Sequence, residues 1–166
     1  MTRDIIERLR VRIATSPSTD CECVPPIVPG PTLNEEAILS AEEELGFRLP
    51  GELRALYLHV ANGGFGPGWG ILSLNEVVEW DHICRAEDGY PPPNWPDKLI
   101  RFCEWGCNFW SGVDCASEQC PIIRFDPDKD VIEMADSLIP ESASLAEWLT
   151  SWLDGTLNFN LNSSER

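Results

Sequence analysis

The fold of this chain is decided by residues 42–57, which read EEELGFRLPGELRALY. Two helical patterns meet in this stretch at a Gly-Phe-x-Leu-Pro break. Gly46 can adopt the left-handed conformation that ends a helix, and Pro50 suits the first turn of the next one. That next helix, predicted to reach about Ala61, is indicated by apolar residues at helical spacing: Leu53, Leu56, Tyr57 and Val60. The stretch contains no nucleophile, phosphate-binding loop or set of metal ligands, so it predicts a fold and not a chemistry.

Length and composition predict a cytoplasmic protein built around one domain. The chain has 166 residues, enough to bury a core, and no stretch approaches the roughly 18 apolar residues of a membrane span. Its first residues alternate charged and aliphatic side chains and lack the apolar centre of a signal peptide. We expect a domain over residues 32–158, an N-terminal helix and proline-rich linker over 1–31 packed on that domain, and a flexible tail over 159–166.

Acidic side chains strongly outnumber basic ones. Twenty-eight Asp and Glu against twelve Lys and Arg give a net charge of −16. The excess is concentrated in residues 76–97 and 111–136, each with a local charge of −5, whereas residues 1–14 carry +2. Such a surface repels nucleic acid and anionic lipid and attracts basic proteins. The charge therefore favours a basic protein partner over nucleic acid or a membrane, although acidic surfaces also serve to keep proteins soluble.

Helical patterns come first along the chain, followed by strand patterns and one last helix. This order is typical of an α+β fold, with a single, mostly antiparallel sheet flanked by helices. Helices are predicted over residues 3–14, from a Thr32-x-x-Glu35 capping box, over the Leu-Pro stretch, from an Asn75 cap, and from a Ser144-x-x-Glu147 capping box. Strands are predicted over residues 71–74, 99–105, 108–114, 122–125 and 131–135.

These patterns together resemble the SUKH superfamily, which includes fungal cell-wall-synthesis regulators and many bacterial immunity proteins. The resemblance rests on residues 42–57, on Asn62-Gly63-Gly64, and on residues 70–76 (GILSLNE), 102–110 (FCEWGCNFW) and 144–149 (SLAEWL). It implies an α+β scaffold that binds proteins and has no shared active site. Bacterial members commonly resemble immunity proteins, which bind and block a toxin domain, often a nuclease.

A catalytic role finds little support in the sequence. Only His59 and His82 could act as a general base near neutral pH, and His59 lies on the Leu-Pro helix, where a packing or surface role is expected. Cys84 lies close to His82 in sequence, but neighbours on one helix do not face each other usefully. We predict no catalytic residue.

The seven cysteines leave metal binding as an alternative. An odd number in this setting favours reduced thiols over a disulfide framework. The spacings Cys21-x-Cys23 and Cys103-x-x-x-Cys107 match no standard zinc knuckle. Cys115 and Cys120 could lie close together in a hairpin and form a labile bridge. We predict neither a bound metal nor a cofactor.

Tryptophans with acidic neighbours form the predicted partner-binding surface. Trp95 lies in a proline-rich loop with carboxylates on both sides, as an aromatic hot spot for a basic partner would; alternatively, it folds back to cover the edge of the sheet. Trp105 and Trp110 lie near strand ends, and two-residue alternation would expose part of this set on the face opposite the helices. The predicted partner-binding residues are Asp81, Glu87, Asp88, Trp95, Asp97, Glu104, Trp105 and Asp114.

The leading functional hypothesis is a non-enzymatic immunity protein that neutralises a cognate, basic toxin domain. The superfamily resemblance, the charge and the missing catalytic residues support it. Two other hypotheses remain open: a regulatory or scaffolding module of the cell-wall-regulator type, and a metalloprotein or thiol enzyme.

Overall fold

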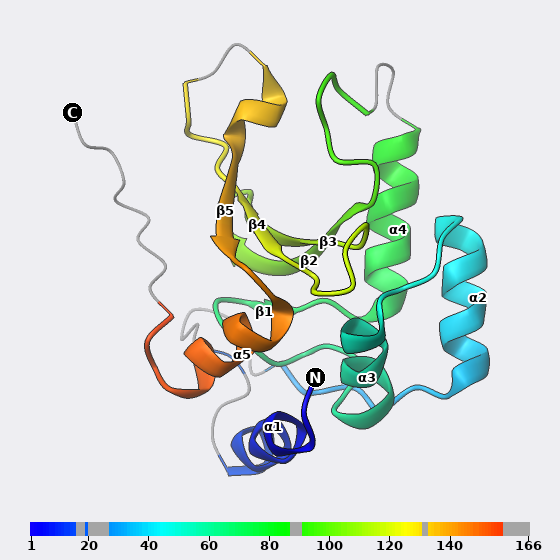
Figure 1. Ribbon diagram of the computed structural model, residues 1–166, viewed down its shortest axis with the longest axis vertical. Coiled ribbons are helices and arrows are strands. Elements are labelled where there is room, and N and C mark those ends of the chain that lie inside the picture. The colour runs from blue at the N-terminus through cyan, green and yellow to red at the C-terminus, as the bar shows by residue number, and fades with distance from the viewer. Residues whose placement is uncertain (16–18, 20–26, 87–90, 131–132, 158–166) are drawn as a thin grey trace.

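The computed structural model describes residues 1–15, 19, 27–86, 91–130 and 133–157, and these form an α+β fold (Figure 1). The predicted fold class is therefore confirmed. The helices are α1 (Arg3–Thr15), α2 (Glu35–Leu45), α3 (Gly51–His59), α4 (Leu74–Arg85) and α5 (Leu145–Leu153), with one 3₁₀ helix, η1 (Met134–Ser137). The strands are β1 (Gly70–Ile71), β2 (Leu99–Gly106), β3 (Phe109–Asp114), β4 (Ile122–Phe125) and β5 (Leu138–Ser142).

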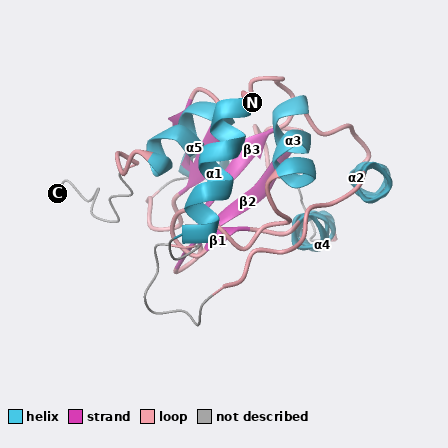
Figure 2. Cartoon of the chain, turned by 90° about the horizontal axis from the view of Figure 1, so that it is seen from below, coloured by secondary structure: helices cyan, strands magenta, loops and turns pink. Residues whose placement is uncertain are grey.

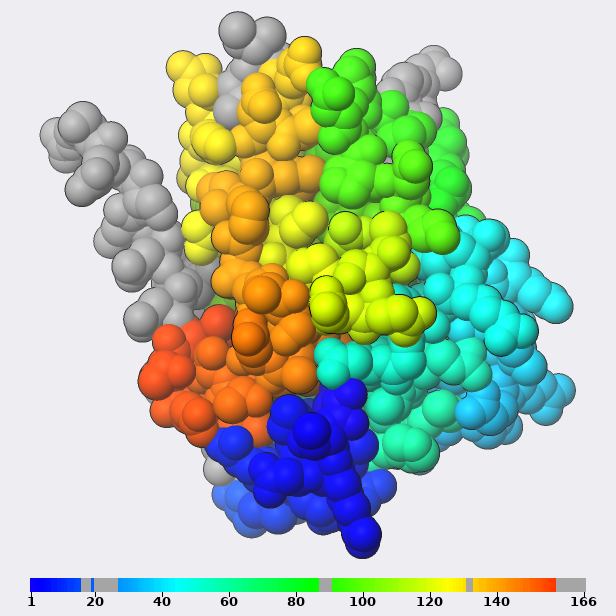
Figure 3. All heavy atoms as spheres, viewed as in Figure 1, coloured from blue at the N-terminus to red at the C-terminus, as the bar shows by residue number. Residues whose placement is uncertain are grey.

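The five strands form one antiparallel meander in the order β1-β2-β3-β4-β5. Seen from below in Figure 2, α1, α3 and α5 lie across one face of the sheet, while α4 and α2 lie to one side of it. Helix α4 packs on β2, and α2 packs on α4. In the space-filling view, α1 is a separate layer at the base that contacts α5 and the α3 region (Figure 3). Helices α1, α3 and α5 thus cover one face of the sheet, while α4 borders the opposite face along β2.

The strand register assigns side chains to two faces, because opposed residues of antiparallel strands share a face. One face carries the opposed, buried residues Ile100, Val113 and Ile122. We call it the inner face, because it packs on α5: the fully buried ring of Trp148 lies 6.0 Å from the ring of Phe102. We call the opposite face the outer face. It carries one row of Glu104, Trp110, Phe125 and Leu138, and a second row of Arg101, Gly112, Ile123 and Pro140.

The α2–α3 junction shows why the Gly-Phe-x-Leu-Pro stretch determines the fold. Gly46 has φ 80° and ends α2, donating its backbone N–H to the carbonyl of Glu42 over 3.0 Å. The Glu42 side chain is buried and accepts from the Leu49 N–H at 2.9 Å and from Arg54 Nη1 at 2.5 Å. This hydrogen bond to Glu42 raises the pKa of Arg54. One buried carboxylate therefore fixes both the end of α2 and the position of α3, which begins directly after Pro50.

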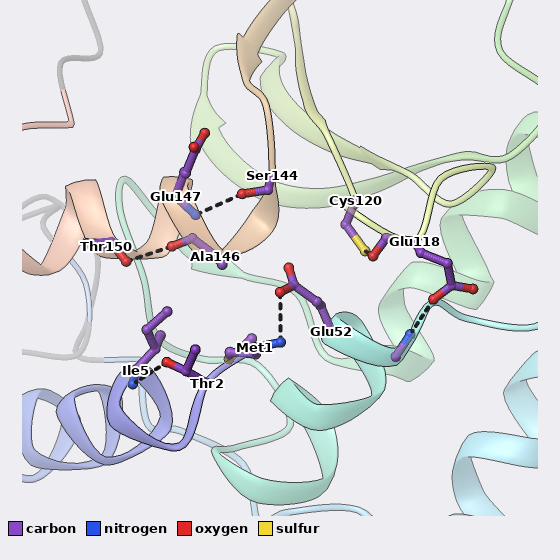
Figure 4. Close-up of polar contacts among 11 residues, drawn as sticks. Met1, Thr2, Ile5, Glu52, Glu118, Cys120, Ser144, Ala146, Glu147 and Thr150 are labelled. Carbon is purple, nitrogen blue, oxygen red and sulfur yellow. Dashed lines mark hydrogen bonds and ion pairs between the residues drawn. The ribbon is translucent and has the colours of Figure 1, made fainter.

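Two of the predicted helix caps were wrong by two residues, and one was confirmed. Helix α2 is capped by Asn34, which accepts from the Ala37 N–H, because the preceding Leu33 N–H is bonded to the Tyr57 carbonyl and holds the chain extended. Helix α4 is capped by Ser73, which forms a reciprocal capping box with Glu76. The Ser144 cap of α5 is confirmed, with its hydroxyl accepting from the Glu147 N–H at 3.1 Å (Figure 4).

The last strand was also predicted at the wrong place. Residues 134–137 form η1 and not a strand, residues 131 and 132 lie outside the described residues, and β5 follows at Leu138. Pro140, in the middle of β5, hides this strand from sequence patterns. Proline is tolerated there because β5 is an edge strand, and it limits pairing with another chain. The first strand is shorter than predicted, covering only Gly70–Ile71.

Candidate protein-binding surface

Three half-buried aromatic rings form a cluster at the centre of the outer face. Trp110 on β3 and Phe125 on β4 are opposed in the register, and their rings stack in parallel with centroids 5.0 Å apart and planes 9° apart. The ring of Trp95 lies 6.1 Å from that of Trp110 and 6.3 Å from that of Phe125. We call these three residues the outer aromatic cluster. Trp95 is thus folded back on the sheet, over its outer face and not over its edge.

Gly112 gives Trp110 the room to lie against the sheet. A Cβ at this position would meet Trp110 Cζ3 at 2.9 Å, Leu99 Cδ1 at 2.8 Å and the Ile100 carbonyl oxygen at 2.9 Å. A larger residue would therefore displace the Trp110 ring or the backbone of β2. The shape of the outer aromatic cluster depends on this glycine.

A stacked arginine extends the aromatic surface towards α4. The guanidinium carbon of Arg101 lies 4.1 Å from the centroid of the Trp80 ring, which is a cation–π distance. Glu104 holds the same guanidinium through two hydrogen bonds, one of them from Nη2 to Oε2 at 2.6 Å. The positive charge on this face is therefore already neutralised within the chain.

Carboxylates surround the outer aromatic cluster. Residues 126–136, between β4 and β5, include five acidic residues and one lysine. Lys129 donates to the backbone carbonyl oxygen of Asp136 at 2.5 Å. Because this contact uses a backbone oxygen, the loop keeps exposed carboxylates. The described carboxylates of this loop, together with one before β2 and one at the end of β3, are called the acidic rim. They are Asp97, Asp114, Asp126, Asp128, Asp130, Glu133 and Asp136.

The loops before β2 and after β4 meet across the outer face. Both rise from the top of the sheet in Figure 1. Asn94, in the loop that carries Trp95, donates from Nδ2 to Oε2 of Glu133 at 2.9 Å. Asn94 has φ 63°, a left-handed conformation that asparagine tolerates and that turns the chain just before Trp95. The two loops together frame a shallow apolar surface with a negative border.

Four of the predicted partner-binding residues lie on or beside this surface. Trp95 belongs to the outer aromatic cluster, Glu104 shares a row with Trp110, and Asp97 and Asp114 belong to the acidic rim. Asp114 is half-buried and accepts from the Ala116 N–H at 2.9 Å.

Of the other four predicted residues, one lies on the inner side, one is buried in an ion pair on α4, and two are outside the described residues. Trp105 lies on the inner side, edge-on to Trp148 at 6.4 Å, and its indole N–H donates to Ser111 Oγ at 2.7 Å. The register shift between Arg101 and Cys103 brings it there. Asp81 is only 9% exposed and pairs with Arg85, Nε to Oδ2, at 2.6 Å. Glu87 and Asp88 lie outside the described residues.

The sequence prediction missed Phe125 and the Trp80–Arg101 stack. Phe125 ends a correctly predicted strand, but only the register shows that it is opposed to Trp110. Arg101 and Glu104 are three residues apart on a strand with an intervening register shift, so strict alternation would have placed them on opposite faces.

The described residues bear on the metal-site and thiol alternatives that the sequence left open. Within residues 1–15, 19, 27–86, 91–130 and 133–157, no group of three or more His, Cys, Asp or Glu could hold a metal ion. Cys115 and Cys120 are free thiols, so the alternative of a labile bridge between them is not what the structure shows. Burial raises the pKa of both, that of Cys120 to about 12, which makes them poor nucleophiles at neutral pH. Cys21 and Cys23 lie outside the described residues.

Comparison with known proteins identifies a family. Residues 32–151 match the family model of the SMI1 / KNR4 family (SUKH-1). No curated protein matches the chain at a significant level. In the part of the chain that the structure describes, no helix is both long enough and apolar enough to cross a bilayer.

Proposed function

The chain belongs to the SMI1 / KNR4 family (SUKH-1), and we propose that it is a non-enzymatic immunity protein that neutralises a basic toxin domain by binding it. Its partner is then a protein and neither nucleic acid nor a membrane, it works in the cytoplasm, and it needs no cofactor. The observation that carries the proposal is the outer face, where a partly exposed aromatic cluster is bordered by α4 on one side and has carboxylates around it.

The composition of this surface fits a tight interface with a basic protein. Tryptophan is among the residues most enriched at binding hot spots, and such residues are typically surrounded by a polar rim that excludes water. Here the rim is almost entirely negative, and the nearby Arg101 is neutralised by Glu104. A nuclease domain is positively charged where it binds phosphates, so this surface could occupy that site in place of nucleic acid.

The sheet itself suits this role because it is rigid. Trp110 and Phe125 stand on adjacent strands whose other face is packed on α5. A binding surface on a rigid scaffold loses little conformational entropy on association. The acidic loops then adjust around a fixed aromatic centre.

Growth rescue tests the proposal. The reading frame beside this gene is expressed under tight control in cells with and without this protein. We expect the neighbouring product to arrest growth and this protein to restore it. A neighbouring product that is harmless, or that kills equally in both cases, contradicts the immunity role.

The second candidate function is a regulatory or scaffolding module of the cell-wall-regulator type. The same outer face would then bind several basic proteins weakly. Affinity purification distinguishes the two functions, because an immunity protein should recover one partner in a one-to-one ratio and a scaffold should recover several.

A further inference from the structure

A narrow slot opens between α4 and the outer face of the sheet. Its free volume is about 60 Å³, and its walls include Trp80 and Cys84 from α4, Leu99 and Arg101 from β2, Trp110 from β3, and Trp95 above them. We call this space the tryptophan slot. At about 30 Å³ for each water molecule in the liquid, it is the size of the end of a leucine side chain.

The walls of the tryptophan slot favour an apolar occupant. Three of them are indole rings, and the Arg101 charge is held by Glu104 and stacked on Trp80. Asp81 also borders the slot, but its carboxylate pairs with Arg85. Concave sites lined mainly by aromatic and apolar side chains favour apolar groups, so an apolar side chain is the expected occupant.

The surroundings of the slot define the sequence around that occupant. Asp97 follows Trp95 by two residues and is exposed, and Glu133 contacts the neighbouring Asn94. Carboxylates therefore stand next to the residue that covers the slot. A chain that placed an apolar side chain in the slot would meet these carboxylates near Trp95, and basic residues are their complement.

We propose that the tryptophan slot receives one leucine-like side chain from the partner, flanked by lysine or arginine residues. The inference deepens the proposed function and rests on it, because it takes the outer face as the partner-binding surface. Anchor side chains that fill pockets near the centre of an interface typically dominate binding energy. The acidic rim then recruits the basic segment, and the slot selects the apolar residue within it.

Two synthetic peptides test the slot without the natural partner. The probe peptides are acetyl-GKKGLGKKG-amide and the matched acetyl-GKKGAGKKG-amide, titrated at physiological salt. Binding is followed by the ¹H–¹⁵N signals of the Trp80, Trp95 and Trp110 indoles, with the fully buried Trp148 as an internal reference. We expect the leucine peptide to bind about 50-fold tighter than the alanine peptide, since it buries about three further carbon atoms.

Two variants at position 84 provide the control. Cys84→Leu fills the slot from α4 without changing any charge, and should reduce the leucine preference to about twofold or less. Cys84→Ala leaves the slot open and should keep the preference. Circular dichroism checks that both variants fold.

Equal affinity of the wild-type protein for both peptides would overturn the inference, as would a preference that survives in Cys84→Leu. The growth rescue is independent of this result. Rescue without a leucine preference contradicts the slot proposal and supports the immunity role. A leucine preference without rescue supports the slot proposal and contradicts the immunity role.

Discussion

The two faces of the sheet carry the same kinds of side chain in opposite settings. On the inner face, the Trp148 ring is fully buried against Phe102 and Trp105. On the outer face, Trp95, Trp110 and Phe125 contact one another just as closely but remain half-exposed. The inner rings are covered by α5, whereas the outer ones are bordered by α4 on one side and remain partly exposed. Exposed apolar clusters are uncommon on monomeric proteins unless they bind something, so we infer that the inner rings stabilise the fold and the outer rings serve recognition.

Polar groups on the two faces differ in the same way. On the inner face the Trp105 indole donates to Ser111, and the Ser111 hydroxyl donates to Glu141 at 2.6 Å. This chain of hydrogen bonds satisfies polar atoms within the protein. On the outer side, exposed carboxylates such as Asp128 and Asp130 face solvent. We infer that the polar groups of the inner face stabilise its packing and that those of the outer side interact with a partner.

The largest expected effect is on the inner face. Trp148→Ala should lower the free energy of unfolding by about 3–5 kcal/mol, because it leaves a cavity in the core. Urea denaturation measures this loss. The control Leu39→Ala, at an exposed position on α2, should cost less than about 1 kcal/mol. A loss of stability below about 1 kcal/mol for Trp148→Ala would contradict the inference that the inner rings stabilise the fold.

The corresponding change on the outer face should act on binding more than on stability. Trp110→Ala is expected to weaken partner affinity by at least about 2 kcal/mol, as removal of a hot-spot aromatic does. Its free energy of unfolding should fall by about 1–2 kcal/mol, because the ring is only half-buried. Calorimetric titration and urea denaturation of one preparation compare the two quantities. A stability loss equal to that of Trp148→Ala, with unchanged affinity, would show that both faces are structural.

Charge on the acidic rim should affect association at low salt. The double variant Asp128→Asn, Asp130→Asn is expected to reduce the association rate constant about threefold to tenfold in low salt, because it weakens the attraction of a basic partner. Stopped-flow mixing measures the rate. The effect should shrink as salt rises, since the Debye length falls to about 3 Å at 1 M.

The matched control for that pair is Glu36→Gln, Glu43→Gln. It removes the same charge from exposed positions on α2, which lies to the side of the sheet beyond α4 (Figure 2). This control should leave the association rate within about twofold of the wild type. Equal slowing by both pairs would mean that net charge, and not the acidic rim, attracts the partner.

The smallest expected effect concerns pH and the inner face. Burial raises the pKa of the Glu141 carboxyl, against the opposing effect of the Ser111 hydroxyl. The folded state therefore binds the Glu141 proton more tightly than the unfolded state does, where the pKa is about 4.3. The contribution of Glu141 to stability then falls as pH rises from about 4 through the raised folded value.

Glu141→Gln removes this pH dependence. At pH 7 the variant should have a higher Tm than the wild type, by less than about 4 °C, the shift that roughly 1 kcal/mol produces in a chain of this size. At pH 3 the two should have equal Tm. Thermal unfolding at both pH values measures this, and a lower Tm for the variant at pH 7 would show that the ionised carboxylate stabilises the inner face.

Local chemistry explains which parts of the fold were predictable. Gly46 and Pro50 act through their own backbone preferences, and Ser144 acts through its side-chain hydroxyl on the nearby backbone, so their effects are visible in the sequence. The β5 strand was not predictable, because Pro140 interrupts its pattern and only its edge position makes proline acceptable.

The assignment of tryptophans to faces required the structure. Register shifts on β2, between Arg101 and Cys103 and between Glu104 and Gly106, break the two-residue alternation. A shift of one residue moves the following side chains to the other face. Trp105 and Trp110 look alike in sequence, yet the first lies in the inner set and the second in the outer aromatic cluster.

Titration of the purified product of the neighbouring gene into this protein and into Trp110→Ala tests the central claim most directly. We predict a one-to-one complex of nanomolar affinity for the wild type, an affinity at least about 30-fold weaker for Trp110→Ala, and no change beyond about twofold for Leu39→Ala. Equal affinities for the wild type and Trp110→Ala would contradict the account, because the partner would then bind away from the outer face.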